Sequence, residues 1–236
     1  VGKKLYVNLF VASKLEWKEN GATFTQETQF PYGESSRITV NLKKNRKFKV
    51  MVRCPEWTDA GFSVKVNGRE YAADAVPSSY VAVERKWKDG DVIEIGLPMH
   101  TVIEPLQNKE EYIAVKYGPI VLAARTSQDN LDGLISDDGR WAHIASGPLT
   151  PLAETPIMIG TKQEIETKLQ NMKPVPGKPL HFTVEGLFDD SKFGSLELEP
   201  FFNLHDSRYA IYFLSLSRAG YNSMGGSQNV NPASGN

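Results

Sequence analysis

Apolar residues in the first hundred positions recur at every second position, and this alternation restricts the possible folds more than any other feature. Ile38, Val40 and Leu42, for example, alternate with Thr39 and Asn41. Successive side chains of a strand point to opposite faces, so this spacing predicts half-buried strands rather than helices. The same alternation occurs in the ranges 5–11, 48–52, 62–66, 81–83 and 93–97.

Turn signals separate these segments. Asn67-Gly68 and Asp89-Gly90 each place a glycine, which adopts positive φ without steric cost, directly after a residue that favours tight turns. Short alternating strands spaced about ten residues apart and joined by such turns are typical of an antiparallel sandwich. We therefore expect residues 1–105 to form a first antiparallel β-sandwich module. The basic cluster 43–47 bridges two of its strands and is interpreted as a solvated hairpin tip.

A second module is expected in residues 106–216. Pro98 and Pro105 lack the N–H that a strand ladder requires, which places a boundary in this region. Residues 112–125 are almost continuously apolar, and this indicates one strand covered on both faces. Residues 126–156 show little alternation and are expected to form a long loop. Its acidic stretch 129–138 lacks the regular spacing of a calcium-binding loop and is interpreted as a polar loop without a bound cation.

One short helix is predicted in the second module. Thr161 and Glu164 have the spacing of a capping box, and Ile165 and Leu169 lie on one helical face. Pro174 is expected to stop this helix. Residues 217–236 are rich in Ser, Gly and Asn and are expected to form a flexible tail. The predicted fold class is therefore all-β, with two antiparallel β-sandwich-like modules and one short helix.

Charge and hydropathy indicate neither a nucleic-acid nor a membrane partner. The 236 residues include 27 basic and 28 acidic side chains, which give a net charge of −1 and no field that attracts polyanions. No apolar run reaches the roughly 18 residues of a spanning helix. Because the first residues do not resemble a signal peptide, any export signal is expected to lie upstream of them.

Cys54 is the only cysteine, so an intrachain disulfide and a multi-cysteine zinc site are both excluded. A reactive thiolate needs a nearby cation, and Arg53 is expected on the opposite face of the strand. We therefore predict a buried and inert thiol. The adjacent carboxylates at 110–111, 137–138 and 189–190 point to opposite sides of an extended chain and are interpreted as solvated turn residues rather than a catalytic pair.

His205, Asp206 and Ser207 carry the residue types of a catalytic triad but are adjacent in sequence. A triad brings its members together from separate segments, so a structural role is predicted here. We expect Asp206 and Arg208 to tie the second module together through charge-assisted hydrogen bonds. The rings at 209 and 212 are expected at the edge of its core.

Four tryptophans are the candidate contacts for sugar rings. Trp57 and Trp87 lie in turn-associated motifs, so core packing is predicted for both. Trp141 and Trp17 are less constrained and are the candidate carbohydrate-binding residues. No catalytic residue, cofactor-binding residue or metal ligand is predicted in this chain.

Seven short motifs and one longer motif resemble glycoside hydrolase family 127, the β-L-arabinofuranosidase-like proteins. The seven resemble the sequence that follows the catalytic barrel in that family, and the longer motif resembles a terminal module found in many members. They are LYVNLF at 5–10, QFPY at 29–32, RCPEW at 53–57, VNG at 66–68, WKDGD at 87–91, LPM at 97–99, YGP at 117–119 and LEPFFNLHDSRY at 198–209.

The resemblance implies an (α/α) barrel upstream, which in this family performs retaining hydrolysis of an L-arabinofuranoside with a zinc-bound cysteine nucleophile and a glutamate partner. None of those catalytic positions matches this chain, and Cys54 does not take that role. The expected function is thus a non-catalytic accessory and scaffold region, with the catalytic barrel of the parent chain as its partner. Zinc is expected only in the barrel, and the resemblance implies a periplasmic or extracellular location.

Two other functions remain open from the residues. A carbohydrate-binding module would recognise plant-type glycans through exposed aromatic side chains, with a glycan as its ligand. A surface adhesion domain of the immunoglobulin type would bind proteins instead, but the chain lacks the Cys-Trp-Cys pattern of that fold.

Overall fold

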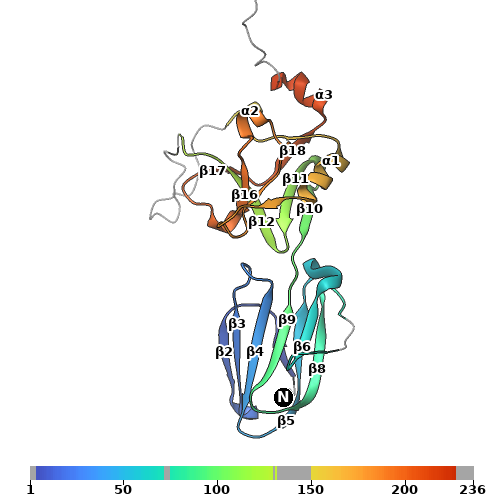
Figure 1. The fold of residues 1–236 in the computed structure, drawn as a ribbon, viewed down its shortest axis with the longest axis vertical. Helices are drawn as coiled ribbons and strands as arrows, with labels where there is room; N and C mark the ends of the chain where they lie inside the picture. Colours follow the sequence, from blue (N-terminus) through green and yellow to red (C-terminus); the bar gives the residue numbers. More distant parts are fainter. Residues whose placement is uncertain (1–3, 72–74, 130, 132–149, 227–236) are drawn as a thin grey trace, which may run out of the picture. The chain divides into compact units, whose positions relative to one another are not determined.

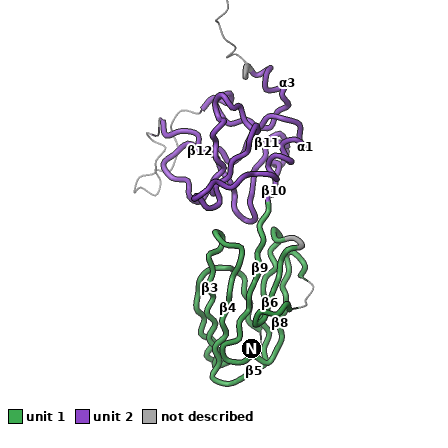
Figure 2. The backbone as a smooth tube through the Cα atoms, in the orientation of Figure 1, with its two compact units in different colours: residues 1–100 green, residues 101–236 purple. Residues whose placement is uncertain are grey.

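The computed structural model describes residues 4–71, 75–129, 131 and 150–226. The chain divides into two compact units, Val1–His100 and Thr101–Asn236, shown in different colours in Figure 2. Strands predominate in both units and the helices are short, which confirms the predicted all-β class. The division lies before the expected boundary of 105/106, because β10 (Thr101–Leu106) pairs with the following strand β11 (Lys109–Tyr117) in unit 2.

Unit 1 contains two sheets, which Figure 1 shows as an elongated pair of layers. One sheet has six strands in the order β2-β3-β4-β9-β6-β7, and the other has three in the order β1-β5-β8. The strands of the first are β2 (Ser13–Trp17), β3 (Ala22–Thr28), β4 (Ser35–Leu42), β9 (Asp91–Gly96), β6 (Ser63–Val66) and β7 (Arg69–Glu70). Those of the second are β1 (Lys4–Val7), β5 (Arg46–Cys54) and β8 (Ser79–Trp87).

The predicted alternation accounts for the core of unit 1. Ile38 and Val40 of β4 face Val50 and Val52 of β5 within one buried cluster, and the residues between them on each strand are more exposed. Burying each such side chain contributes roughly 1.5–3 kcal/mol. Trp87 closes this core, since its ring is fully buried and its Nε1 donates a hydrogen bond of 3.0 Å to a backbone carbonyl.

Two details of unit 1 differ from the antiparallel hairpins that we predicted. β1 pairs with β5 in parallel, because the chain leaves β1 for the other sheet and no tight turn fixes the direction of β1. The basic cluster 43–47 is exposed as expected, but it connects β4 of one sheet to β5 of the other. It is therefore a crossing between sheets and not a hairpin tip.

Both predicted turns are present in unit 1. Asn67 and Gly68 have φ of 53° and 74° and join β6 to β7, as a two-residue hairpin with positive φ at both positions requires. Gly90 has φ of 78° and lies between β8 and β9, where the chain again passes from one sheet to the other. Asp89 Oδ1 accepts a hydrogen bond of 2.9 Å from the N–H of Leu42, which fixes this second crossing.

Unit 2 is built on one hydrogen-bonded network of nine strands. Its main order is β13-β18-β11-β12-β16-β15-β14, with β10 added to β11 and β17 added to β12. The strands not yet described are β12 (Ile120–Ser127), β13 (Met158–Ile159), β14 (Lys173–Pro174), β15 (Phe182–Thr183), β16 (Glu197–Pro200), β17 (Arg208–Ala210) and β18 (Phe213–Leu216).

The apolar stretch 112–125 was predicted as one strand, and this prediction is wrong. It forms most of β11 and β12, which pair in an antiparallel hairpin with Tyr117 opposite Ile120. Gly118, with φ of 55°, and Pro119 make the turn between them. Pro105 lies inside β10 rather than breaking the ladder. Among the described strands β10 pairs only with β11, as an edge strand does, and its register shifts directly after the proline.

The predicted helix is α1 (Lys162–Gln170), and its capping box is confirmed. The Thr161 N–H donates to Glu164 Oε2 at 2.7 Å, and the Glu164 N–H donates to Thr161 Oγ1 at 3.3 Å. The first of these bonds is the main reason that the pKa of Glu164 lies below its usual range. Ile165 and Leu169 are buried as predicted, and the helix ends before Pro174.

Residues 217–226, expected as part of a flexible tail, are folded. Ser217 caps the short helix α3 (Arg218–Tyr221), and the π-helical turn Asn222–Gly226 follows it. Tyr221 is buried against Ile157, and the other members of this small cluster are Ile159 and Leu214. A single aromatic residue thus anchors a segment whose average composition is polar. None of the helices in the described part of the chain has the length and hydrophobicity to cross a membrane.

Candidate functional site

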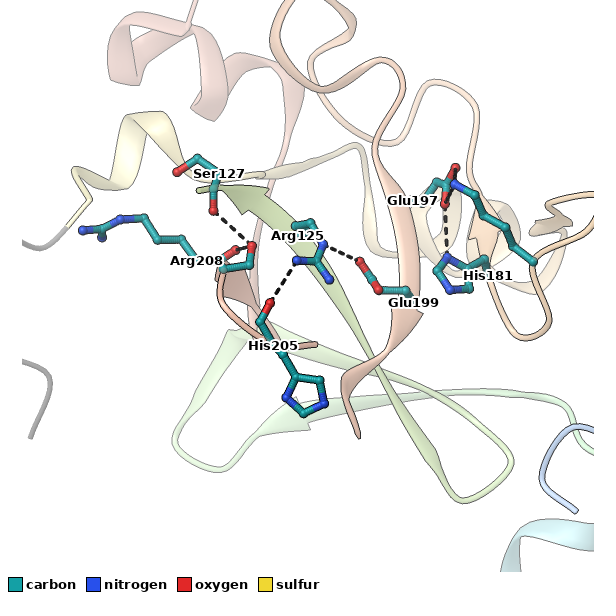
Figure 3. A network of polar contacts seen from close by, with 9 residues as sticks. Arg125, Ser127, His181, Glu197, Glu199, His205 and Arg208 are labelled. Carbon is teal, nitrogen blue, oxygen red and sulfur yellow. Dashed lines mark hydrogen bonds and ion pairs between the residues drawn. The ribbon is translucent and has the colours of Figure 1, made fainter. Parts of the chain in front are cut away.

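One face of the unit 2 sheet carries a network of charged side chains, drawn in Figure 3. On β16, Leu198 points into the core, so Glu197 and Glu199 project from the opposite face. Arg125 of β12 and His181, which precedes β15, lie on the same face because β12 and β15 flank β16. We call these four residues, together with Lys178 and Lys192, the charged face.

Glu197 is the centre of the first half of this network. Lys178 Nζ donates to both carboxylate oxygens, at 2.8 and 2.9 Å, and His181 Nδ1 lies 3.1 Å from Oε2. The hydrogen bonds from Lys178 are the largest reason that the pKa of Glu197 lies below its usual range. Glu197 is therefore ionised at neutral pH. A glycosidase acid needs the opposite, a carboxyl group whose pKa is raised.

Glu199 and Arg125 form the second half of the network. Arg125 Nε donates to Glu199 Oε1 at 3.2 Å, and a second guanidinium nitrogen donates to the carbonyl oxygen of His205 at 3.2 Å. The Glu199 side chain is 11% exposed and the Arg125 side chain 36%, so the carboxylate is largely buried while the guanidinium is partly open to water. The pair connects β12, β16 and the segment before β17, as Figure 3 shows.

A cavity of about 450 Å³ opens on the charged face. Besides the two glutamates, its walls include Arg125, Lys178, Lys192, Phe193 and Ser195. Lys192 comes from α2 (Asp190–Phe193) and also donates to the carbonyl oxygen of Ala153 at 3.2 Å. The cavity therefore combines hydrogen-bond donors, acceptors and an aromatic wall.

The segment 205–207 has a structural role and not that of a triad. The hydroxyl of Ser207 lies 3.0 Å from the Ser127 carbonyl oxygen and 2.9 Å from the Arg208 carbonyl oxygen. The ring of His205 points away from Arg125, which contacts only its backbone, as Figure 3 shows. Arg208, predicted to act with Asp206, donates to the Asp129 carbonyl oxygen at 3.0 Å and to the Thr150 hydroxyl at 3.2 Å.

Tyr209 and Tyr212 do not enter the core edge as predicted. They are 49% and 48% exposed. Tyr209 is exposed because Arg208 and Ala210 occupy the more buried positions of the short strand β17, and Tyr212 lies after the end of that strand. The Tyr209 ring instead contacts the exposed ring of Phe201, with 5.1 Å between centroids. Together with Phe202, these rings form a group of exposed aromatic side chains within residues 201–212.

Cys54 is fully buried, as predicted. Its Sγ lies 3.8 Å from the hydroxyl of Thr58, and burial raises the pKa of the thiol. Arg53 is exposed and so lies on the other face of the strand. The thiol is therefore protonated at neutral pH and shielded from ligands. Among the described residues, no group of three or more His, Cys, Asp and Glu side chains is placed to hold a metal ion.

The tryptophans predicted to pack do so. Trp87 is buried, and the half-buried Trp57 stacks on Phe30 with a centroid distance of 5.6 Å. Trp17, a candidate sugar contact, is also half-buried and lies 5.6 Å from the ring of Phe48. Trp141 lies outside the described residues, as do 137–138 and most of the acidic stretch 129–138.

The adjacent carboxylates at 110–111 and 189–190 have different surroundings. Glu110 and Glu111 are exposed as predicted, but they lie in strand β11 and not in a turn. Asp189 has a more specific role, because it caps α2 by accepting from the N–H of Ser191 at 3.0 Å and also accepts a hydrogen bond from Tyr221. Sequence reasoning missed this second contact because Tyr221 lies in a segment of low-complexity composition.

Unit 1 carries an apolar patch that the alternation did not predict. Leu9 and Val11 were expected within a half-buried strand, but β1 ends at Val7 and both residues are exposed, at 64% and 56%. They line a groove of about 250 Å³ together with Tyr6 and Leu15. Tyr80 extends this surface, since its ring meets Tyr6 edge-on at 5.3 Å. We call these five residues the apolar patch.

The apolar patch lies where both sheets of unit 1 end. β1 is an edge of the three-stranded sheet and β2 is an edge of the six-stranded sheet, and the groove lies between residues of these two strands. Natural proteins usually protect open sheet edges by charges or by a covering element. β2 carries such charges at Lys14 and Glu16, and the aliphatic side chains of Leu9, Val11 and Leu15 are exposed beside them.

The fold and the site together define a class of protein: a two-unit β-sheet chain with a charged face, an exposed apolar patch and a buried, protonated thiol. Residues 4–99 match the family described as the middle domain of GH127, β-L-arabinofuranosidase. Unit 1 is therefore a GH127 region. Residues 102–215 match a family described as a domain of unknown function. The boundary between the two matches agrees with the division into two units.

Solved structures share this fold at low sequence identity. A GH127 β-L-arabinofuranosidase from Geobacillus stearothermophilus T6 is 17% identical with a TM-score of 0.59, and 92% of this chain aligns with 34% of it. A protein named glycoside hydrolase gives 19% identity, a TM-score of 0.56 and coverages of 89% and 35%. A further GH127 β-arabinofuranosidase is 18% identical with a TM-score of 0.56, and 91% of this chain aligns with 35% of it. The chain thus spans about a third of their length, and no curated protein matches it significantly.

Proposed function

We propose that this chain is a non-catalytic accessory and scaffold region of a glycoside hydrolase that resembles the β-L-arabinofuranosidases. The observation that carries this proposal is the match of residues 4–99 to a GH127 middle domain. The alignment with only about a third of three glycoside hydrolase structures supports it, because a catalytic domain then has room in the remaining two thirds.

The apolar patch supports the contact with a catalytic domain that a scaffold requires. Leu9, Val11 and Leu15 present aliphatic side chains that offer no hydrogen bonds to a hydroxyl-rich glycan. Such a surface gains most from burial against another apolar protein surface, at about 25 cal/mol for each Å² removed from water. We therefore propose that the apolar patch contacts the catalytic domain of the parent protein.

The absence of hydrolysis is the first test of this function. Cys54 is protonated and buried, and Glu197 is held in its ionised form by Lys178, so neither group is arranged as a nucleophile or a general acid. We expect no turnover when the 236-residue chain is mixed with a chromogenic β-L-arabinofuranoside and zinc. Turnover that disappears in Cys54→Ala would contradict the proposal.

Docking is the second test, and the chain offers a matched control for it. Val11 and Val76 are exposed to nearly the same degree, 56% and 57%, but Val76 does not line the groove. We expect the chain to bind the separately produced catalytic domain of a GH127 β-L-arabinofuranosidase in sedimentation velocity experiments. Val11→Glu should weaken this binding at least about tenfold, because it places a charge in an apolar interface, whereas Val76→Glu should not. Equal effects of the two substitutions would refute the assignment of the patch.

A carbohydrate-binding module remains the alternative. Trp17 supports it poorly, because the ring is half-buried beside Phe48 in the unit 1 core. The test of this alternative therefore depends on Trp141. If an arabinan gel retains the chain and retains the Trp141→Ala variant less, the carbohydrate-binding function is favoured.

A further inference from the structure

We propose that the cavity on the charged face of unit 2 is a binding site for a neutral, hydroxyl-rich ligand of the saccharide class. Its lining residues include no described tryptophan and no residue of the apolar patch. It involves residues of β12, α2, β16 and the segment before β15. The proposal therefore does not depend on docking to a catalytic domain.

Most of the charges in the cavity are already paired with one another. Arg125, Lys178 and Lys192 carry positive charges, and Glu197 and Glu199 carry negative charges, so the sum is +1. Lys178 and Arg125 are each paired with a glutamate, at 2.8 and 3.2 Å. A carboxylate of a ligand would compete with a glutamate for its basic partner, and a cation of a ligand would compete with a basic residue for its glutamate. Hydroxyl groups can bind without breaking either pair.

The unused hydrogen-bonding capacity of these groups matches hydroxyl groups. A carboxylate offers about four acceptor sites and a guanidinium offers five N–H donors. Within the described residues, Glu199 accepts one hydrogen bond and Arg125 donates two. A sugar hydroxyl donates one hydrogen bond and accepts two, so neighbouring hydroxyls can use the remaining acceptors of Glu199 and donors of Arg125 at the same time.

The ion pairs hold these groups in place before a ligand arrives. Glu197 and Glu199 project from one strand that has a paired strand on each side, and each carboxylate is fixed by a basic residue from a neighbouring segment. Little side-chain ordering then remains to be completed on binding, which favours affinity. Phe193 and Leu196 add apolar surface to the wall, which suits the C–H face of a sugar ring. The volume of about 450 Å³ lies in the range of small-molecule sites.

Titration of the isotope-labelled 236-residue chain by NMR tests this proposal. The probes are glucose and L-arabinose as neutral ligands, glucosamine as a cation and glucuronate as an anion. We expect both neutral sugars to shift the backbone amide signals of Arg125, His181 and Glu197 in a saturable way. Glucosamine should bind about tenfold more weakly than glucose, because its ammonium enters a cavity whose charges sum to +1. Glucuronate should bind no more tightly than glucose, because its carboxylate competes with Glu197 and Glu199 for their basic partners.

Three variants locate the binding. Glu199→Gln keeps the side-chain volume but removes the charge that holds Arg125, and it should weaken glucose binding about tenfold. Ser195→Tyr fills the exposed side of the cavity without altering either ion pair, and it should abolish binding even if Glu199→Gln fails to fold. Glu185→Gln is the matched control, since Glu185 forms a fully surface-exposed pair with Lys173 at 3.4 Å and does not line the cavity.

Clear outcomes would overturn the proposal. These are the absence of localised signal shifts with either neutral sugar, tighter binding of glucosamine or glucuronate than of glucose, and glucose binding that persists unchanged in Ser195→Tyr. None of them bears on the sedimentation test of the apolar patch, so the two proposals can fail separately.

Discussion

At the scale of single residues, Tyr221 and Asp189 join the last helical turns to the rest of unit 2. The Tyr221 hydroxyl donates to Asp189 Oδ2, and the ring is buried. Burial, followed by this hydrogen bond, raises the pKa of Tyr221 to about 12. The same hydrogen bond is the main reason that the pKa of Asp189 lies below its usual range. Each shift makes the stability of unit 2 depend on pH.

We predict that Tyr221→Phe lowers the free energy of unfolding of unit 2 by about 1.5–3 kcal/mol at neutral pH, the contribution of a hydrogen bond to a charged group. The variant should also lose the pH dependence that comes from Tyr221 and weaken the one that comes from Asp189, whose pKa Ser191 and Lys192 also lower. The contribution of Asp189 to the free energy of unfolding is present above the pKa of about 4 that this group has in the unfolded chain, and it is lost as the pH falls. The contribution of Tyr221 is present below about pH 10 and is lost as the pH rises toward 12. Urea unfolding at several pH values measures both.

Tyr212→Phe is the control for this prediction, because that ring is largely exposed and the substitution is chemically identical. A loss of stability in Tyr212→Phe equal to that in Tyr221→Phe would show that the buried hydrogen bond is not the cause.

At the scale of elements, helix α1 depends on its first turn. Its capping box satisfies two backbone N–H groups that have no partner within the helix. We predict that Thr161→Ala destabilises unit 2 by about 1 kcal/mol. Thr167→Ala is the internal comparison, since Thr167 lies mid-helix and alanine has the higher helix propensity, so that variant should not destabilise the unit. Equal losses in urea unfolding would contradict the role of the cap.

The elements also show how far the sequence could predict this fold. The alternation around Ile38 and Val50 predicted the strands of unit 1, because a buried face repeats with the period of a strand. It could not distinguish Leu9 and Val11 from buried strand residues. Both have the same spacing, but they lie beyond the end of β1 and are exposed. The apolar run 112–125 concealed the turn at Gly118, since each strand of that hairpin has a stretch of consecutive buried residues, 113–115 and 122–124.

The candidate site could not be predicted from local pattern. Arg125, His181 and Glu199 come from three segments far apart in sequence, and only the strand order β12-β16-β15 brings them to one face. By contrast, the inert role of Cys54 could be predicted, because burial and the opposite orientation of Arg53 follow from a single strand.

At the scale of the whole molecule, the two units have separate hydrophobic cores. We predict two thermal transitions in calorimetry. Ile93→Ala in unit 1 and Leu198→Ala in unit 2 each remove a fully buried aliphatic side chain, at a cost of about 2–5 kcal/mol. Each substitution should lower the midpoint of only one transition. A shift of both midpoints by either variant would show that the units unfold as one cooperative body.

The repeated passage of the chain between the sheets of unit 1 also determines how this unit responds to a protease. The crossing at 43–47 is exposed and basic, so trypsin has access to it. A cut there separates β4 from β5, yet each resulting fragment contributes strands to both layers. The nicked unit should therefore stay associated and co-elute under native conditions, and its two fragments should part only in denaturant.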